Sequence, residues 1–129
     1  MSESILKALM QLFAIIARPN SDEDSRRPLV KLFLNQQLNK ELVSEYLIVF
    51  DNYYQEHQKK SQHKKRIAAS SVRVLTICTL INKELAIKQK IVVLLRLLEF
   101  INSEGKATEQ EFEFVKTVAE TFHIPYDEY

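Results

Sequence analysis

Apolar residues recur at intervals of three and four along most of the chain, the spacing that places them on one face of an α-helix. Ile5, Leu9 and Leu12 begin the first such stripe, with polar Lys7 and Gln11 between them. Comparable stripes follow in five further segments. The pattern predicts six helices, over residues 4–17, about 25–37, 40–58, 72–81, 87–101 and 109–122.

Polar residues and the single glycine mark where these helices begin and end. Asn39 is a favoured N-cap for the third helix. Thr108 followed by Glu111 has the spacing of a capping box, which predicts the start of the last helix. Gly105 falls where the fifth helix must end in a left-handed residue. Pro28 fits only the opening turn of a helix, so the second helix is expected to begin at residue 25 or 26.

The stripes also predict which side chains are buried. The second helix is expected to bury Leu29, Leu32 and Phe33. Apolar residues surround most of the segment 72–81, so it is expected to be the central and most buried helix. The apolar stripe expected for the third helix consists of Val43, Tyr46, Leu47, Phe50, Tyr53 and Tyr54.

Length and composition fit one all-α domain over residues 1–129. The chain has 129 residues, of which 46% are hydrophobic, with one glycine and three prolines, too few for the turns of a β-sandwich or barrel. The only cysteine, Cys78, lies in an apolar run and is expected to be a buried small hydrophobe. The first residues lack a basic signal-peptide region, which predicts a cytoplasmic protein.

The chain also matches itself weakly at a shift of 85 positions. This shift places Val30-Lys31 on Val115-Lys116, and Leu9-Met10-Gln11-Leu12 on Leu94-Leu95-Arg96-Leu97. An internal duplication and shared helical periodicity both account for the match. Near the end of the chain, Pro125 is suited to the first turn of another helix. We therefore expect these residues to be the N-terminal part of a longer polypeptide.

Residues 94–111, which read LLRLLEFINSEGKATEQE, resemble the TerB-like family of all-helical domains named from bacterial tellurite resistance. Gly105 and Glu111 match the family's motif, whereas Glu104 stands in place of its usual aspartate. In the first half of the chain Pro19, Asn20 and Arg26 occupy the corresponding places, so the acidic motif is absent there. The resemblance implies a helical bundle of about six helices over nearly the whole chain.

A narrower likeness concerns residues 77–85, Gln89-Lys90 and the N-terminal start. These residues are similar to the TerB-like N-terminal portion of large bacterial transporter proteins, in which ABC-type ATPase, FHA and membrane segments follow. The resemblance implies a non-catalytic interaction or regulatory domain at the inner face of the membrane. No phosphate-binding glycine loop is present in the sequence, so the domain itself is not expected to bind ATP.

Two clusters of charge are candidate sites. Glu104 and Glu111 are candidate ligands of a divalent cation, because hard cations prefer several carboxylate oxygens. The capping box with Thr108 is the stronger explanation of Glu111. A stand-alone TerB-like stress-response protein that binds a cation through these acids is the alternative function.

The second cluster is a basic stretch between the third and fourth predicted helices, which we call the basic joint. Five bases and no acid occur within residues 57–66. Such a cluster suits a protein partner, other domains of a longer chain or an anionic membrane surface, or is simply a solvated joint. The lack of interleaved aromatic residues disfavours nucleic acid. The bases of the joint are Lys59, Lys60, Lys64, Lys65 and Arg66.

No catalytic set can be assembled from the remaining residues. His57 and His63 have no histidine or acid three or four residues away, and His123 follows the last predicted helix, so all three are expected to be solvated. The sequence therefore predicts no enzyme activity and no cofactor, and leaves docking through surface patches as the expected mechanism.

Overall fold

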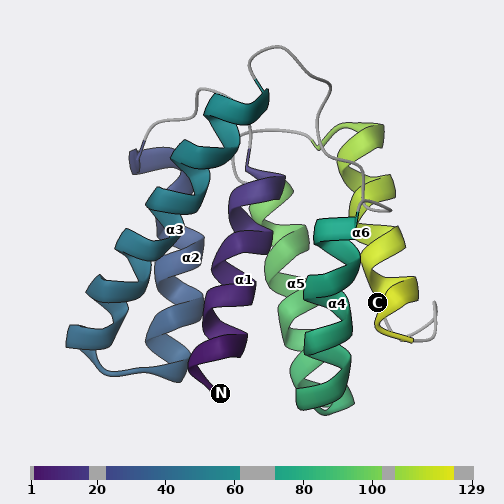
Figure 1. Ribbon diagram of the computed structural model, residues 1–129, viewed down its shortest axis with the longest axis horizontal. Coiled ribbons are helices and arrows are strands. Elements are labelled where there is room, and N and C mark those ends of the chain that lie inside the picture. Colours follow the sequence, from purple (N-terminus) through teal and green to yellow (C-terminus); the bar gives the residue numbers. More distant parts are fainter. Residues whose placement is uncertain (1, 18–22, 62–71, 103–106, 124–129) are drawn as a thin grey trace. The chain divides into compact units, whose positions relative to one another are not determined.

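The computed structural model describes residues 2–17, 23–61, 72–102 and 107–123, and these contain six α-helices and no strand. The all-α prediction is confirmed (Figure 1). The chain divides into two compact units, residues 1–67 and 68–129, each with its own helices. The helices are α1 (Glu3–Ile16), α2 (Glu23–Gln37), α3 (Lys40–Ser61), α4 (Val72–Glu84), α5 (Ile87–Asn102) and α6 (Glu109–Thr121).

The predicted caps set the helix boundaries. Asn39 Oδ1 accepts a hydrogen bond from the Leu42 amide at 3.1 Å, as an N-cap should. Thr108 Oγ1 accepts from the Glu111 amide at 3.2 Å, and Glu111 Oε1 accepts from the Thr108 amide at 2.9 Å. Both halves of the capping box are therefore formed at the start of α6. Gly105 lies outside the described residues.

The second helix begins earlier than its proline suggested. α2 starts at Glu23, so Pro28 lies inside the helix, in its second turn rather than its first. A proline there removes one backbone hydrogen bond. The packing of the residues that follow compensates for this loss, because Val30, Phe33 and Leu34 are fully buried.

The expected buried face of α2 was partly wrong. Phe33 is buried as expected, but Leu29 is only half-buried and Leu32 is 43% exposed. Val30, three residues before Phe33, and Leu34, the residue after it, take the buried places instead. The apolar run Leu29-Val30 and Leu32-Phe33-Leu34 contains two overlapping stripes, and only packing against α1 and α3 selects between them.

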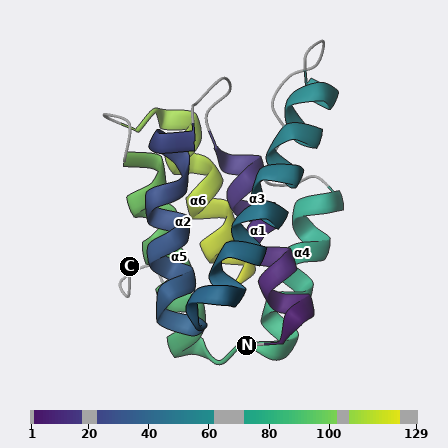
Figure 2. The same cartoon turned by 90° about the vertical axis from the view of Figure 1, so that its left-hand side faces the viewer.

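In the first unit, residues 1–67, α2 and α3 both pack against α1. The contact between α1 and α3 is the most extensive of any helix pair in the described residues. Phe13 of α1 meets Phe33 of α2 with ring centroids 5.8 Å apart and tilted planes, a favourable aromatic geometry. α2 and α3 are joined by a short turn and run side by side in opposite directions (Figure 2).

The most buried helix is α1, and the expectation that this would be the helix at 72–81 was wrong. In α4 Leu75 is 41% exposed and Leu80 is half-buried, while Val74, Ile77, Cys78 and Ile81 are buried. Its outer surface also carries Thr76 and Thr79, which mark a solvent face. In α1, by contrast, Lys7 is the only exposed side chain after the first turn. The side chains of α1 that are buried are Ile5, Leu6, Ala8, Leu9, Met10, Leu12, Phe13, Ala14, Ile15 and Ile16.

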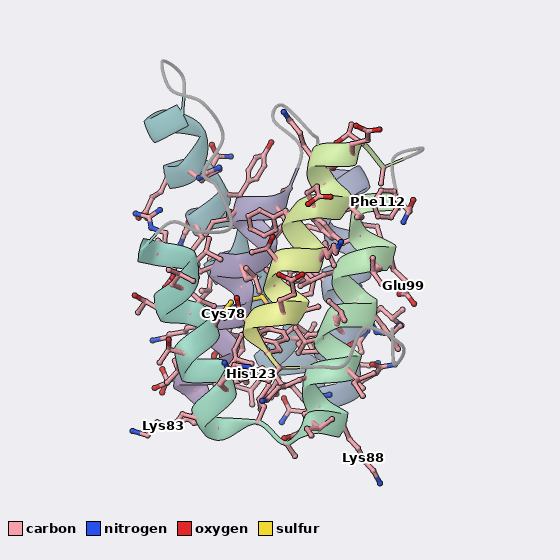
Figure 3. The ribbon with its side chains drawn as sticks, turned by 90° about the vertical axis from the view of Figure 1, so that its right-hand side faces the viewer. Cys78, Lys83, Lys88, Glu99, Phe112 and His123 are labelled. Atoms are coloured by element: carbon pink, nitrogen blue, oxygen red, sulfur yellow. The ribbon has the colours of Figure 1, made fainter. Side chains whose placement is uncertain are left out.

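The second unit, residues 68–129, consists of α4, α5 and α6. α5 and α6 run in opposite directions and pack together, and α4 packs on α6 (Figure 3). α5 is a helix throughout, so the apolar run that resembles a strand at residues 91–95 is helical as expected. Its buried stripe includes Val93, Leu94, Leu97 and Ile101.

The two units share the spacing that the sequence match indicated. Residues 3–16 of α1, shifted by 85 positions, become 88–101 and lie within α5 (Ile87–Asn102). Residues 23–37 of α2 become 108–122 and enclose α6 (Glu109–Thr121). Val30 and Val115 are both buried, and Lys31 and Lys116 are both exposed. The helix pairs α1–α2 and α5–α6 therefore correspond in position at this shift, and the matched valines and lysines correspond in burial. The single-domain interpretation stays a prediction.

The central position of α1 predicts how leucine substitutions affect stability. Leu9→Ala removes a side chain with 0% exposure and should lower the free energy of unfolding by about 2–5 kcal/mol. Leu32→Ala makes the same chemical change at a position 43% exposed and should cost about 1 kcal/mol or less. Urea denaturation followed by circular dichroism measures both. Equal losses in the two variants would contradict the placement of α1 at the core.

Candidate functional site

The buried polar groups of the second unit lie at helix ends. Among the described residues, the buried polar or charged side chains are His57, Lys90 and Glu111, and the last two belong to this unit. Glu111 is only 2% exposed, and its carboxylate accepts the Thr108 amide. One of the two predicted metal ligands is therefore the reciprocal member of a helix cap, as its spacing from Thr108 allowed.

The metal prediction stays a prediction. Glu104, the other expected ligand, lies outside the described residues. Within the part of the chain that the structure describes, no three His, Cys, Asp or Glu side chains come together in a group able to hold a metal ion. Glu109, two residues before Glu111, is exposed at the start of α6. Two carboxylates in the first turn also interact favourably with the positive end of the helix dipole.

A second set of polar side chains caps the C-terminal end of α6. The last carbonyls of a helix lack partners within the helix and carry the negative end of its dipole. Asn82 Nδ2, from α4, donates to the Thr121 carbonyl at 2.6 Å. Lys90 Nζ, from α5, donates to the Phe122 carbonyl at 3.2 Å, and this lysine is only 8% exposed. One helix end therefore joins all three helices of the unit.

The backbone after α6 turns sharply at this end. His123 has φ of 60°, the left-handed conformation that commonly follows a helix and that usually favours glycine. Its amide donates to the Glu120 carbonyl at 3.0 Å. The His123 side chain is exposed, as the sequence predicted, and lies at the end of α6 (Figure 3).

His57 was expected to be solvated, and this was wrong. It is 4% exposed, on the face of α3 that also buries Phe50 and Tyr54. Positions 50, 54 and 57 are spaced by four and three residues, so His57 continues the apolar stripe of α3 by about one turn beyond Tyr54. Tyr46 and Tyr54 are buried and Tyr53 is half-buried, as expected of a core and its rim. His63 lies outside the described residues.

An ion pair joins α2 and α3 in the first unit. Arg27 Nε donates to Asp51 Oδ2 at 2.8 Å, and Arg27 Nη2 donates to the same oxygen. The two side chains are 34% and 15% exposed, so solvent screens the pair only in part. This contact fixes the register of α2 on α3. Sequence reasoning did not find it, because the partners are 24 residues apart on different helices.

Two ionisable groups at the start of α1 influence each other. The hydrogen bond and charge of Glu3, 3.0 Å from Lys7 Nζ, raise the pKa of Lys7. Burial raises the pKa of Tyr46, and the charge of Glu3 raises it further. Both shifts have structural causes: an exposed pair on one helix, and a buried phenol.

Cys78 is buried, as predicted (Figure 3). Burial raises the pKa of its thiol from the ordinary 9.0 to about 11. The nucleophilic form of cysteine is the thiolate, so this thiol is unreactive near neutral pH. No described feature of the site activates it.

The basic joint is described only at its beginning. Lys59 and Lys60 lie in the last turn of α3, which ends at Ser61, three residues beyond the expected Gln58. Lys64, Lys65 and Arg66 lie outside the described residues. The joint as a docking surface therefore stays a prediction.

None of the described helices is long and apolar enough to cross a membrane.

Comparison with known proteins adds no assignment. No family model matches the chain, and no curated protein and no solved structure matches it significantly. The resemblance to the TerB-like family therefore stays a prediction.

The capping box predicts a measurable loss of stability. Thr108→Ala removes the acceptor for the Glu111 amide and should destabilise the second unit by about 1 kcal/mol. Thr79→Ala is the matched control, because the Thr79 hydroxyl donates only to the Leu75 carbonyl on the exposed face of α4. Chemical denaturation compares the two. A larger loss from Thr79→Ala would refute the assigned role of the cap.

The Cys78 thiol predicts a specific dependence of stability on pH. Because the folded state keeps the proton to about pH 11 and the unfolded chain releases it near 9.0, rising pH favours the unfolded chain between these values. The free energy of unfolding should therefore fall more steeply from pH 9 to pH 11 in the wild-type protein than in Cys78→Ala. Denaturation at a series of pH values gives both slopes. Parallel slopes would show that burial does not hold the proton on the thiol.

Proposed function

We propose that this chain is a non-catalytic helical interaction module. The observation that supports the proposal is the use of its buried polar groups. Glu111 and Lys90 each satisfy backbone groups at an end of α6, and Arg27 and Asp51 join α2 to α3. These groups have structural tasks, whereas catalysis requires polar groups that converge on a substrate.

The outer surfaces of the helices favour docking. Large apolar side chains are exposed on α2, α3, α4, α5 and α6, and apolar surface is the main source of binding free energy between proteins. The most exposed of them exceed half of their possible area. The exposed large apolar residues are Leu32, Leu42, Ile48, Leu75, Ile87, Leu95 and Phe112.

The context of this module follows from the resemblance in the sequence. We propose that it serves as the N-terminal, cytoplasmic portion of a bacterial ABC-type transporter ATP-binding protein, docking on a protein partner or on other domains. In this proposal the bases of the basic joint supply a charged contact in addition to the apolar ones. An anionic membrane surface would attract the same bases.

A binding experiment tests the proposal. The chain is immobilised, partners from a bacterial lysate are captured and identified, and each is purified and titrated against the chain. A saturable interaction with a defined stoichiometry is expected. The charge of the basic joint is then reversed with Lys59→Glu, Lys60→Glu, Lys64→Glu and Lys65→Glu. This variant should bind the partner about ten-fold or more weakly, since each base contributes on the order of 1 kcal/mol at an acidic surface.

Charge-preserving controls distinguish docking from non-specific adsorption. Replacing the same four lysines by arginine keeps the charge and should leave the affinity within about two-fold if the contact is electrostatic. If no captured protein binds saturably after purification, the interaction module is contradicted. Turnover of a substrate by the purified chain would contradict its non-catalytic character.

A further inference from the structure

The correspondence between the two units places an exposed apolar face where the first unit has a helix. α1 corresponds to α5, and α2 to α6, at the shift of 85 positions. In the first unit α3 packs along α1 and α2. In the second unit α4 packs on α6, where Asn82 reaches its C-terminal end. The side of α5 and α6 that corresponds to the α3 site can therefore be compared residue by residue.

α5 lacks the second covered face of α1. Both helices bury the same stripe: Leu9 and Leu94, like Leu12 and Leu97, are each 0% exposed. α1 buries a second stripe as well, and the residues of α5 at the corresponding places are half-buried or exposed. Met10 is 0% exposed, whereas Leu95 at the same place is 46% exposed. The other pairs are Leu6 with Ile91, Phe13 with Leu98 and Ala14 with Glu99.

α6 shows the same difference at one informative position. Phe112 occupies the place of Arg27, the residue of α2 that pairs with Asp51 of α3. Phe112 is 45% exposed. It lies on the same side of the α5–α6 pair as Glu99 (Figure 3), and Glu99 shares its face of α5 with Leu95, four residues earlier. The exposed Leu95 and Phe112 and the half-buried Leu98 therefore form one apolar face, which we call the α5–α6 face.

The charged residues around the α5–α6 face differ in sign between its two ends. Glu99, Glu109 and Glu113 are exposed at the end where α5 finishes and α6 begins. Lys88 is exposed at the opposite end of α5, seven residues before Leu95 and on the same face (Figure 3). Lys116 lies one turn beyond Phe112, toward that basic end. A helix that lies on the face parallel to α5 meets a lysine at its N-terminal end and carboxylates at its C-terminal end.

This pattern complements a helix of the α3 type. α3 has Glu41 and Glu45 in its first two turns and Lys59 and Lys60 in its last turn, an order that also suits the helix dipole. At the place of Asp51 such a helix needs an apolar residue, because Phe112 replaces Arg27.

We propose that the α5–α6 face binds an amphipathic helix of a partner protein, acidic at its N-terminal end, basic at its C-terminal end and apolar opposite Phe112. The proposal rests on the interaction function above and specifies its partner. The face takes the partner helix in the position and direction that α3 has on α1 and α2, and the apolar contact with Leu95 and Phe112 provides the affinity.

A synthetic peptide with the sequence of residues 40–61 tests this directly. In one version Asp51 is replaced by leucine, and the parent version keeps it. The native α3 is tethered to its own site at a high effective concentration, so neither peptide displaces it. Fluorescence anisotropy with the intact chain should show that the Asp51→Leu peptide binds about ten-fold more tightly than the parent peptide, a difference of about 1.4 kcal/mol.

A reciprocal substitution makes the test specific. Phe112→Arg recreates the Arg27–Asp51 pairing in the second unit, so the chain should now prefer the parent peptide. Leu32→Arg is the matched control, because Leu32 is 43% exposed on α2 and belongs to neither helix of the face, and it should leave the original preference unchanged. Circular dichroism confirms that both variants are folded.

Three outcomes would overturn the inference: no binding of either peptide, equal affinity for both, or a preference that survives Phe112→Arg. Sedimentation of the chain alone gives a further way to overturn the inference. Self-association that Phe112→Arg abolishes would show that a second copy, and not a partner protein, covers the face. These failures are distinct from failure of the interaction function, because a partner captured equally well by the Phe112→Arg chain would leave that function intact.

Discussion

The packing of α1 against its neighbours is the constraint on which the first unit depends. A helix can bury nearly its whole circumference only if other helices cover several of its sides, and α1 has its most extensive contact with α3 and an aromatic contact with α2. Its sequence meets this demand with apolar residues at almost every position between Ile5 and Ile16. The ends of the surrounding helices are then fixed by local caps and by the Arg27–Asp51 pair.

The second unit is held together by a narrower apolar contact and by polar contacts at a helix end. α5 has the buried stripe of α1 but a narrower apolar surface, and the unit gains cohesion from polar contacts at the end of α6. The Lys90 ammonium and the Asn82 amide satisfy carbonyls that would otherwise be buried without a partner in the helix. In the described residues no counterpart of α3 covers α5 and α6, and these helices show both a polar anchor at one end and an exposed apolar face along one side.

Much of this arrangement could be predicted from sequence, because it follows from local signals. The spacing of apolar residues located all six helices, and the Asn39 cap and the Thr108–Glu111 box located two of their starts. The predictions of burial that were wrong depended on residues distant in the chain. Leu32 and Leu75 are exposed and His57 is buried because of what packs beside them. Lys90 gave one usable signal, since it interrupts the buried stripe of α5 one turn before Leu94.

Native-state hydrogen exchange of α1 and α5 tests the central claim, that the two helices are equivalent except for one covering helix, most directly. Local stability follows the number of packed neighbours, so the central amides of α1 should exchange more slowly than those of α5 in the free protein. Binding of a helix to the α5–α6 face should slow α5 selectively and reduce this difference. Equal protection of α1 and α5 in the free protein would contradict the account, since α5 would then need no further partner.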